Sequence, residues 1–286
     1  MPRRQALEVK TPDQLRLMRR AGLVVARTLD AVVAQVRAGV TTRELDAVAA
    51  ASIAAAGARP SFLGYGADEG RPGFPGVVCL SVDDEVVHGV PGPRVLADGD
   101  LLSIDCGAVV EGWHGDAAVS VVVGEHPPPP DVAGLLETTR SALWHGVAAL
   151  RVGGRVGDVA AGVEEVVGGR PYGVVEDYVG HGIGSAMHME PDVPHRRPRG
   201  PLAGLRGRGP RLVPGTVLAV EPMLTLGEPE THELDDGWTA VTDDGGWACH
   251  WEHTVALTPT GLWVLTAHDR GEAALGALGA PFGPLD

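Results

Sequence analysis

The apolar and polar positions near the start of the chain predict two helices, each with a capping signal in its first turn. The segment Thr11-Pro12-Asp13-Gln14 has a capping threonine, proline at the first helical position and glutamine at the third, and predicts a helix from about Pro12 to Val36. Thr41 and Glu44 repeat this signal, and the alanine-rich stretch after them predicts a second helix to about Ala56. We therefore expect two helices before the first strand.

The next apolar stretches are rich in valine and isoleucine, which favours strands. Residues 77–87 and 101–123 have this composition and are broken by turn sequences, so they predict antiparallel strands. Four prolines at 127–130 then interrupt the pattern. The remaining predicted elements are two helices, at about Asp131–Leu150 and Val156–Val167, and three strands, near Val174–Val179, Val217–Leu224 and His250–Leu257.

The order helix, helix, strands thus occurs twice. The second helix of each set ends in a similar sequence, Gly-Ala-Arg59-Pro60 and Gly-Gly-Arg170-Pro171, 111 residues apart. This self-similarity predicts two pseudo-symmetric halves within one domain over residues 1–286. We expect the segment 1–10 and the tail at about 270–286 to be peripheral.

Composition and charge exclude several functional classes. The 286 residues are 44% apolar, enough for a substantial core, and no apolar run of membrane-spanning length is free of charge. The net charge of −14 argues against DNA or a membrane as a partner. The charged N-terminal sequence predicts a cytoplasmic protein. Three scattered cysteines, Cys79, Cys106 and Cys249, predict reduced thiols rather than a disulfide framework.

Metal-binding chemistry is indicated by Asp105 and Asp116, eleven residues apart on either side of a turn, because a tight hairpin would bring them together. His181, Glu221 and Glu252 each lie in a further apolar or glycine-rich segment. A lone buried carboxylate is costly, so four carboxylates that converge would require cations. They carry a charge of −4, which two divalent ions would balance.

Two such ions, about 3.5 to 4 Å apart, can hold a bridging water and lower its pKa, which supports hydrolysis near neutral pH. A mostly oxygen ligand set suits manganese, iron(II) or cobalt, with zinc as a further candidate.

With these residues in this order, the sequence resembles the type I methionine aminopeptidases of the pita-bread hydrolase group over nearly its whole length. The resemblance implies an α/β (α+β) fold with a curved, mainly antiparallel sheet covered by helices. It also implies removal of the initiator methionine from nascent proteins when the second residue is small. The implied metal ligands are Asp105, Asp116, His181, Glu221 and Glu252, with Asp116 and Glu252 bridging.

The resemblance also implies the groups that handle substrate. His88 would contact the scissile amide nitrogen, His188 would stabilise the carbonyl oxygen as it gains charge, and Glu221 would shuttle the proton. The segments that resemble the family's methionine pocket contain Phe62, Tyr65, Cys79, Met187 and Trp238. Met187 stands where a larger aromatic residue is expected, which predicts a slightly wider pocket.

Alternatives remain at this point. The five ligands alone also fit an Xaa-Pro aminopeptidase or prolidase of the same fold, and a remote alternative is a non-catalytic pita-bread protein that binds partners. The arginine-rich segment Arg196–Arg211 reads either as a solvated loop or as a local contact with ribosomal RNA phosphates. We expect a monomer.

Overall fold

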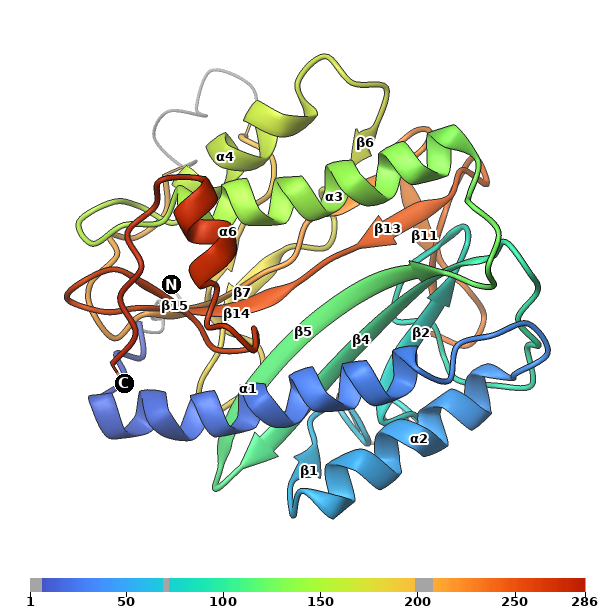
Figure 1. Ribbon diagram of the computed structural model, residues 1–286, viewed down its shortest axis with the longest axis horizontal. Coiled ribbons are helices and arrows are strands. Elements are labelled where there is room, and N and C mark those ends of the chain that lie inside the picture. The colour runs from blue at the N-terminus through green and yellow to red at the C-terminus, as the bar shows by residue number, and fades with distance from the viewer. Residues whose placement is uncertain (1–6, 69–71, 199–207, 286) are drawn as a thin grey trace.

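The computed structural model describes residues 7–68, 72–198 and 208–285, and places helices against antiparallel sheets (Figure 1). The helices are α1 (Pro12–Val33), α2 (Thr42–Ala55), α3 (Pro130–Ala148), α4 (Asp158–Val167) and α6 (Glu272–Ala277). The first strands are β1 (Arg59–Pro60), β2 (Val78–Val82), β3 (Glu85–Val87), β4 (Leu101–Val110), β5 (Trp113–Val122), β6 (Gly173–Val174), β7 (Gly180–Gly182) and β8 (Met189–Val193). They are followed by β9 (Val217–Val220), β10 (Met223–Thr225), β11 (Thr231–Glu233), β12 (Ala240–Thr242), β13 (Ala248–His250), β14 (His253–Leu257) and β15 (Leu262–Val264).

Both predicted capping signals are confirmed at the starts of α1 and α2. At α1, the Gln14 side chain accepts a hydrogen bond from the Thr11 backbone N–H at 2.8 Å, while the Thr11 hydroxyl accepts one from Gln14. Thr41 and Glu44 form the same reciprocal pair at α2. These bonds satisfy N–H groups that the first helical turn leaves without intrahelical partners.

The described strands pair in antiparallel fashion in four sheets. Their orders are β1-β4-β2 with β5 on the other edge of β4, β13-β10-β6, β11-β12-β3, and β15-β14-β9-β7-β8. The longest pairing joins β4 and β5 through a hairpin whose turn residues Glu111 and Gly112 have φ of 50° and 85°. The Glu-Gly sequence at this turn therefore permits the left-handed backbone that a tight hairpin requires.

Three predicted strands differ from the structure. The strand expected at 174–179 is reduced to Gly173–Val174, and the region 217–224 is two strands separated by Glu221 and Pro222. Proline cannot donate to a sheet ladder, which explains the second break. The region 250–257 is likewise divided, at Trp251 and Glu252, between β13 and β14.

Two apolar cores lie under two helix pairs, in keeping with the predicted repeat of helix, helix and strands. One core packs α1 and α2 against β2, β4 and β5, and the other packs α3 and α4 against β9, β13 and β14. Figure 1 shows α1 running beside β4 and β5, and α3 running beside β13. Antiparallel sheets covered by helices, as predicted from the sequence, are confirmed.

The C-terminal tail packs against the second core. Leu275 of α6 is fully buried in the second core, and Phe282 packs against the same core. None of the helices in the described ranges combines the length and the apolarity needed to cross a bilayer.

Candidate active site

The two aspartates of the β4–β5 hairpin lie on the sheet face that points away from α1 and α2. Ile104 and Cys106 belong to the core under those helices, so the alternating strand geometry places Asp105 on the opposite face. Asp105 is paired with Ala118, and Asp116 lies two positions further along the same face of β5. The hairpin therefore makes the two carboxylates diagonal neighbours, as the sequence predicted.

Three further ligand-type side chains come from the second half of the chain. His181 is the central residue of β7, and Glu221 follows directly after β9. Glu252 lies between β13 and β14, where its backbone exchanges hydrogen bonds with Ala118 of β5 at 3.0 and 3.4 Å. This pairing places Glu252 close to Asp116, which lies two residues from Ala118 on β5.

The five side chains surround one small buried cavity. Suitable atoms of Asp116, His181 and Glu252 all lie within 4.8 Å of one another. Nε2 of His181 is 3.4 Å from Oε1 of Glu221. The structure therefore brings together the five residues that the sequence resemblance proposed as a single ligand set.

The cluster lacks the hydrogen bonds that buried carboxylates need. One oxygen on each carboxylate is enclosed and has no hydrogen-bond partner in the described part of the chain, namely on Asp105, Asp116, Glu221 and Glu252. Buried polar atoms are nearly always satisfied by protein, water or an ion. Four such oxygens and an imidazole around one cavity form a donor set that fits divalent cations.

Burial also sets the protonation of the cluster. It raises the pKa of Asp105, Glu221 and Glu252 well above their ordinary values, and neighbouring carboxylates raise them further. Burial raises the pKa of Asp116 to about 7 and lowers that of His181 to about 3. Loss of hydration is the main cause of these shifts, and a bound cation would favour the charged form of the carboxylates and so reverse the rise in their pKa.

The two histidines expected to face substrate also line this cavity. His88 follows β3 in the left-handed backbone region, with φ of 59°, and its ring meets Tyr178 edge to face. The ring of His188 packs edge to face against His181, with centroids 4.4 Å apart. Burial lowers the pKa of His88 to about 4 and also lowers that of His188, so both rings are neutral near pH 7.

One wall of the cavity is apolar. Phe62, Cys79 and Met187 form a small buried cluster with Phe74, against which Trp238 packs. Phe74 meets Phe62 and Trp238 edge to face, with ring centroids 6.5 and 5.5 Å apart. All five residues expected in the pocket line it, namely Phe62, Tyr65, Cys79, Met187 and Trp238.

The sequence did not indicate several residues of the site. Phe74 and Val87 line the cavity, and only the presence of an aromatic residue in a Gly-Pro segment could have pointed to Phe74. His195 accepts a hydrogen bond from the Glu221 backbone N–H at 3.0 Å, and His250 lies 3.9 Å from Oε2 of Glu221. Both imidazoles are buried. No local motif marks them, because their contacts come from distant strands.

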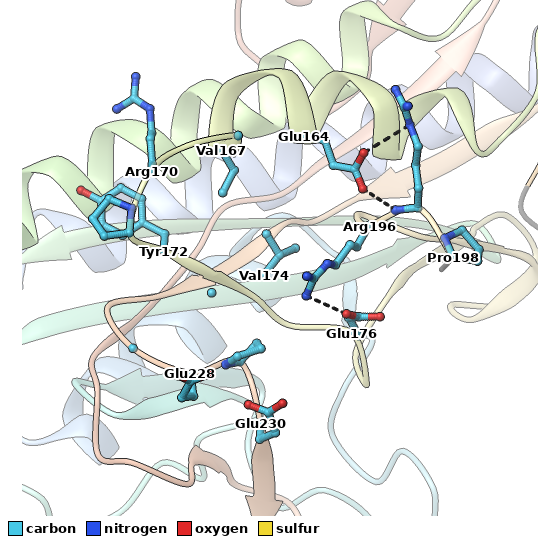
Figure 2. Close-up of a pocket in the computed structure, with 16 residues that line it drawn as sticks. Glu164, Val167, Arg170, Tyr172, Val174, Glu176, Arg196, Pro198, Glu228 and Glu230 are labelled. Carbon is cyan, nitrogen blue, oxygen red and sulfur yellow. Dashed lines mark hydrogen bonds and ion pairs between the residues drawn. The ribbon is translucent and has the colours of Figure 1, made fainter. Parts of the chain in front are cut away.

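A larger depression lies elsewhere, beside α4 and the segment that leads into β6 (Figure 2). Its volume is about 1090 Å³, against about 80 Å³ for the cavity between the carboxylates. Figure 2 shows Arg196 reaching Glu176, and Arg197 pairs with Glu164. None of the predicted catalytic or ligand residues lines this depression. The volume of a cavity alone therefore does not identify the candidate active site.

The segment Arg196–Arg211 is only partly described, because Arg199 and Arg206 lie outside the described residues. Arg196 and Arg197 pair with glutamates, and Arg211 donates to the Gly153 carbonyl oxygen at 3.2 Å. Part of the segment's positive charge is therefore neutralised within the protein.

The chain shows clear similarity to known proteins. Metallopeptidase family M24 matches residues 16–259. Methionine aminopeptidase 1 of Mycobacterium tuberculosis is 46% identical over 270 residues, which cover 92% of this chain and 96% of that protein. Methionine aminopeptidase 1 of Bacillus subtilis is 42% identical, with 90% and 98% covered.

Solved structures agree. Methionine aminopeptidase from Thermotoga maritima superposes with a TM-score of 0.84 at 35% identity, covering 92% of this chain and all of that one. Prolidase from Pyrococcus furiosus has a TM-score of 0.70 at 21% identity and is covered over 66% of its length, a likeness of fold alone.

Proposed function

This chain belongs to metallopeptidase family M24 and, within it, to the methionine aminopeptidases, and on that premise we propose that it removes the initiator methionine from new proteins at the cavity between the carboxylates. The observation that carries the assignment to this cavity is the convergence of five ligand-type side chains on an apolar pocket. A methionine aminopeptidase needs both the metal-binding side chains and the apolar pocket next to the scissile bond.

We propose that Asp105, Asp116, His181, Glu221 and Glu252 would hold two divalent metal ions. The unsatisfied oxygen on each carboxylate supports this, as does the balance between four negative charges and two divalent ions. When bound, such ions lower the pKa of a water molecule and polarise the scissile carbonyl.

The remaining steps belong to side chains of the protein. His88 contacts the scissile amide nitrogen, and Glu221 shuttles the proton toward the leaving amine. His188 donates a hydrogen bond to the carbonyl oxygen as negative charge develops there. Their positions around one cavity support these roles.

The apolar wall receives the methionine side chain. Phe62, Phe74 and Trp238 supply flat apolar surface, while Cys79 and Met187 supply polarisable sulfur. Met187 in place of a larger aromatic ring predicts that the pocket also accepts side chains somewhat bulkier than methionine.

Peptide hydrolysis distinguishes this function from that of the prolidase-like relatives. We expect purified protein loaded with Mn²⁺ or Co²⁺ to cleave Met-Ala-Ser and to act far more slowly on Xaa-Pro peptides. Glu221→Gln is expected to lower the turnover number by about 10²-fold or more. Faster cleavage of the proline peptides would overturn the substrate assignment, and complete inactivity of the loaded protein would favour a non-catalytic binding role.

Cellular context is a further part of the proposal. We expect a monomer, and we expect it in the cytoplasm, where nascent proteins are available as substrate. Sedimentation velocity tests the oligomeric state.

A transient ribosome contact through Arg196–Arg211 stays a prediction. The test is salt-dependent cosedimentation with ribosomes, before and after alanine replacement of the six arginines in this segment. Cosedimentation that is unchanged by these replacements would remove the idea.

A further inference from the structure

Tyr65 makes a direct contact with one of the two substrate-facing histidines. Its hydroxyl lies 2.5 Å from Nδ1 of His188, and the two rings meet edge to face with centroids 5.0 Å apart. The residues are 123 positions apart in sequence. The phenol is therefore more than a wall of the methionine pocket.

The backbone around Tyr65 is fixed in place. Tyr65 donates its N–H to Phe62, and its carbonyl accepts from the Phe74 N–H at 2.9 Å, while Gly64 donates to the Phe74 carbonyl. Gly64 and Gly66 on either side have φ of 79° and 71°, a conformation that favours glycine. A Cβ at Gly66 would also lie 2.8 Å from the ring of Trp238. The loop thus holds the phenol in a defined position.

The direction of this hydrogen bond decides what His188 can do. A neutral imidazole has one N–H, and the partner of one nitrogen determines which nitrogen carries it. Burial raises the pKa of Tyr65, so the phenol keeps its proton and can donate. When Tyr65 donates to Nδ1, the N–H of His188 must lie on Nε2.

We propose that Tyr65 is a positioning residue whose hydroxyl holds His188 in the Nε2–H tautomer, so that a neutral imidazole donates to the carbonyl oxygen of the scissile bond. This inference rests on the proposed role of His188 in peptide hydrolysis. The opposite tautomer would present a lone pair to an oxygen that becomes negative, and would repel it. Tyr65 therefore acts on catalysis through His188, without touching the reacting atoms.

Nitrogen NMR of the metal-free protein at pH 8 tests the tautomer without any turnover. With ¹⁵N-labelled histidine, and with His188→Gln to assign the signals, we expect Nε2 of His188 to be protonated and Nδ1 to be a hydrogen-bond acceptor. In Tyr65→Phe, we expect the Nδ1 signal to shift and the two tautomers to mix. An Nδ1–H tautomer in the parent protein, or an unchanged spectrum in Tyr65→Phe, would overturn the proposal.

Kinetics on Met-Ala-Ser separate positioning from pocket shape. Tyr65→Phe keeps the ring, so we expect kcat to fall about tenfold while KM changes less than about twofold. Tyr172→Phe, the same change in the outer depression of Figure 2, is the matched control and should retain the parent kinetics. A raised KM with unchanged kcat would show that Tyr65 is only a pocket wall. Preference of the parent for Xaa-Pro peptides would instead contradict the proposed function and leave the tautomer result standing.

Discussion

Asp116 is 3% exposed, and its Oδ1 has no hydrogen-bond partner within the described residues. Its neighbours are other carboxylates, so in the metal-free protein it adds like charge in a place that water cannot screen. Without a bound cation, a buried carboxylate of this kind destabilises the folded protein. It can contribute to stability and function only when cations are bound. Burial disfavours the charged form of this carboxylate, which raises the pKa of Asp116 to about 7.

The first prediction follows from the sign of that shift. The folded pKa of Asp116, about 7, exceeds the unfolded value of about 3.9. The folded chain therefore binds more protons between these values, and the free energy of unfolding falls as pH rises through about 4 to 7. Asp116→Asn removes this contribution, so in EDTA at pH 8 we expect the variant to melt about 2 °C or more above the parent.

Thermal unfolding in EDTA at pH 5 and pH 8 measures the effect. The exposed Asp192 offers a matched control, because Asp192→Asn also removes one carboxylate and should not raise the melting temperature at pH 8. Equal pH dependence in the parent and in Asp116→Asn would contradict the interpretation.

Thr254 shows how two elements are joined at the site. Its hydroxyl on β14 accepts from the Asp116 N–H at 3.0 Å and donates to the Asp116 carbonyl at 2.7 Å. One side chain thus fixes the backbone of Asp116, a proposed ligand on β5, from a residue 138 positions away in the chain. Groups that orient metal ligands typically contribute 10- to 100-fold to metal affinity.

We therefore predict that Thr254→Val, which keeps the shape of the side chain, weakens Mn²⁺ binding about tenfold in titration calorimetry. Thr254→Ser keeps the hydroxyl and should bind Mn²⁺ nearly as the parent does. Equal affinity in the valine and serine variants would show that the hydroxyl has no part in orienting Asp116.

The packing of α1 depends on a glycine. A Cβ at Gly22 would lie 2.2 Å from the Leu265 carbonyl oxygen, and one at Gly115 of β5 would lie 2.7 Å from the Gly22 nitrogen. Backbone atoms cannot move aside cheaply, so we predict that Gly22→Ala lowers the free energy of unfolding by about 2 kcal/mol or more. Gly276→Ala in α6 meets open space and should raise it by about 0.5 to 1 kcal/mol.

Denaturant unfolding of the two variants checks this pair of opposite signs. If Gly22→Ala leaves the free energy of unfolding unchanged, α1 can move away from Leu265 without loss of stability.

At the scale of helices and strands, the sequence correctly predicted the features that depend on residues close together in the chain. The capping threonines Thr11 and Thr41 begin their helices as expected, because their partners lie three residues away. The β4–β5 hairpin also follows from alternation and a short turn. Short strands such as β8 and β11 were missed, since their pairing depends on distant neighbours rather than on their own propensity.

The residues of the site also fall into two groups, those that the sequence indicated and those that only the fold reveals. Its ligand-type residues could be proposed because their order matches a known family, whereas Phe74 and His195 emerge only from the fold. The bond between Tyr65 and His188 spans 123 residues, and no local pattern encodes it.

At the scale of the whole molecule, the cavity joins the two halves of the chain. Asp105 and Asp116 come from the sheet under α1 and α2, while His181, Glu221 and Glu252 come from the strands associated with α3 and α4. Cations held between them would therefore link two cores that otherwise meet through strand contacts. Ligands that bind only the folded state stabilise it by an amount that grows with the logarithm of their concentration relative to Kd.

We predict that chelation lowers the melting temperature of the intact protein in one cooperative transition. At a metal concentration of about 100 times Kd the bound ion contributes about 2.7 kcal/mol, which corresponds to about 5 °C for a chain of this size. Differential scanning calorimetry with EDTA and then with excess Mn²⁺ measures both the loss and its recovery. Glu252→Gln removes one carboxylate of the proposed ligand set and should show a clearly smaller difference between the two conditions, because its metal affinity is expected to be reduced. An EDTA-treated parent that melts at the same temperature as the Mn²⁺-loaded protein would show that the carboxylate cavity does not hold the metal.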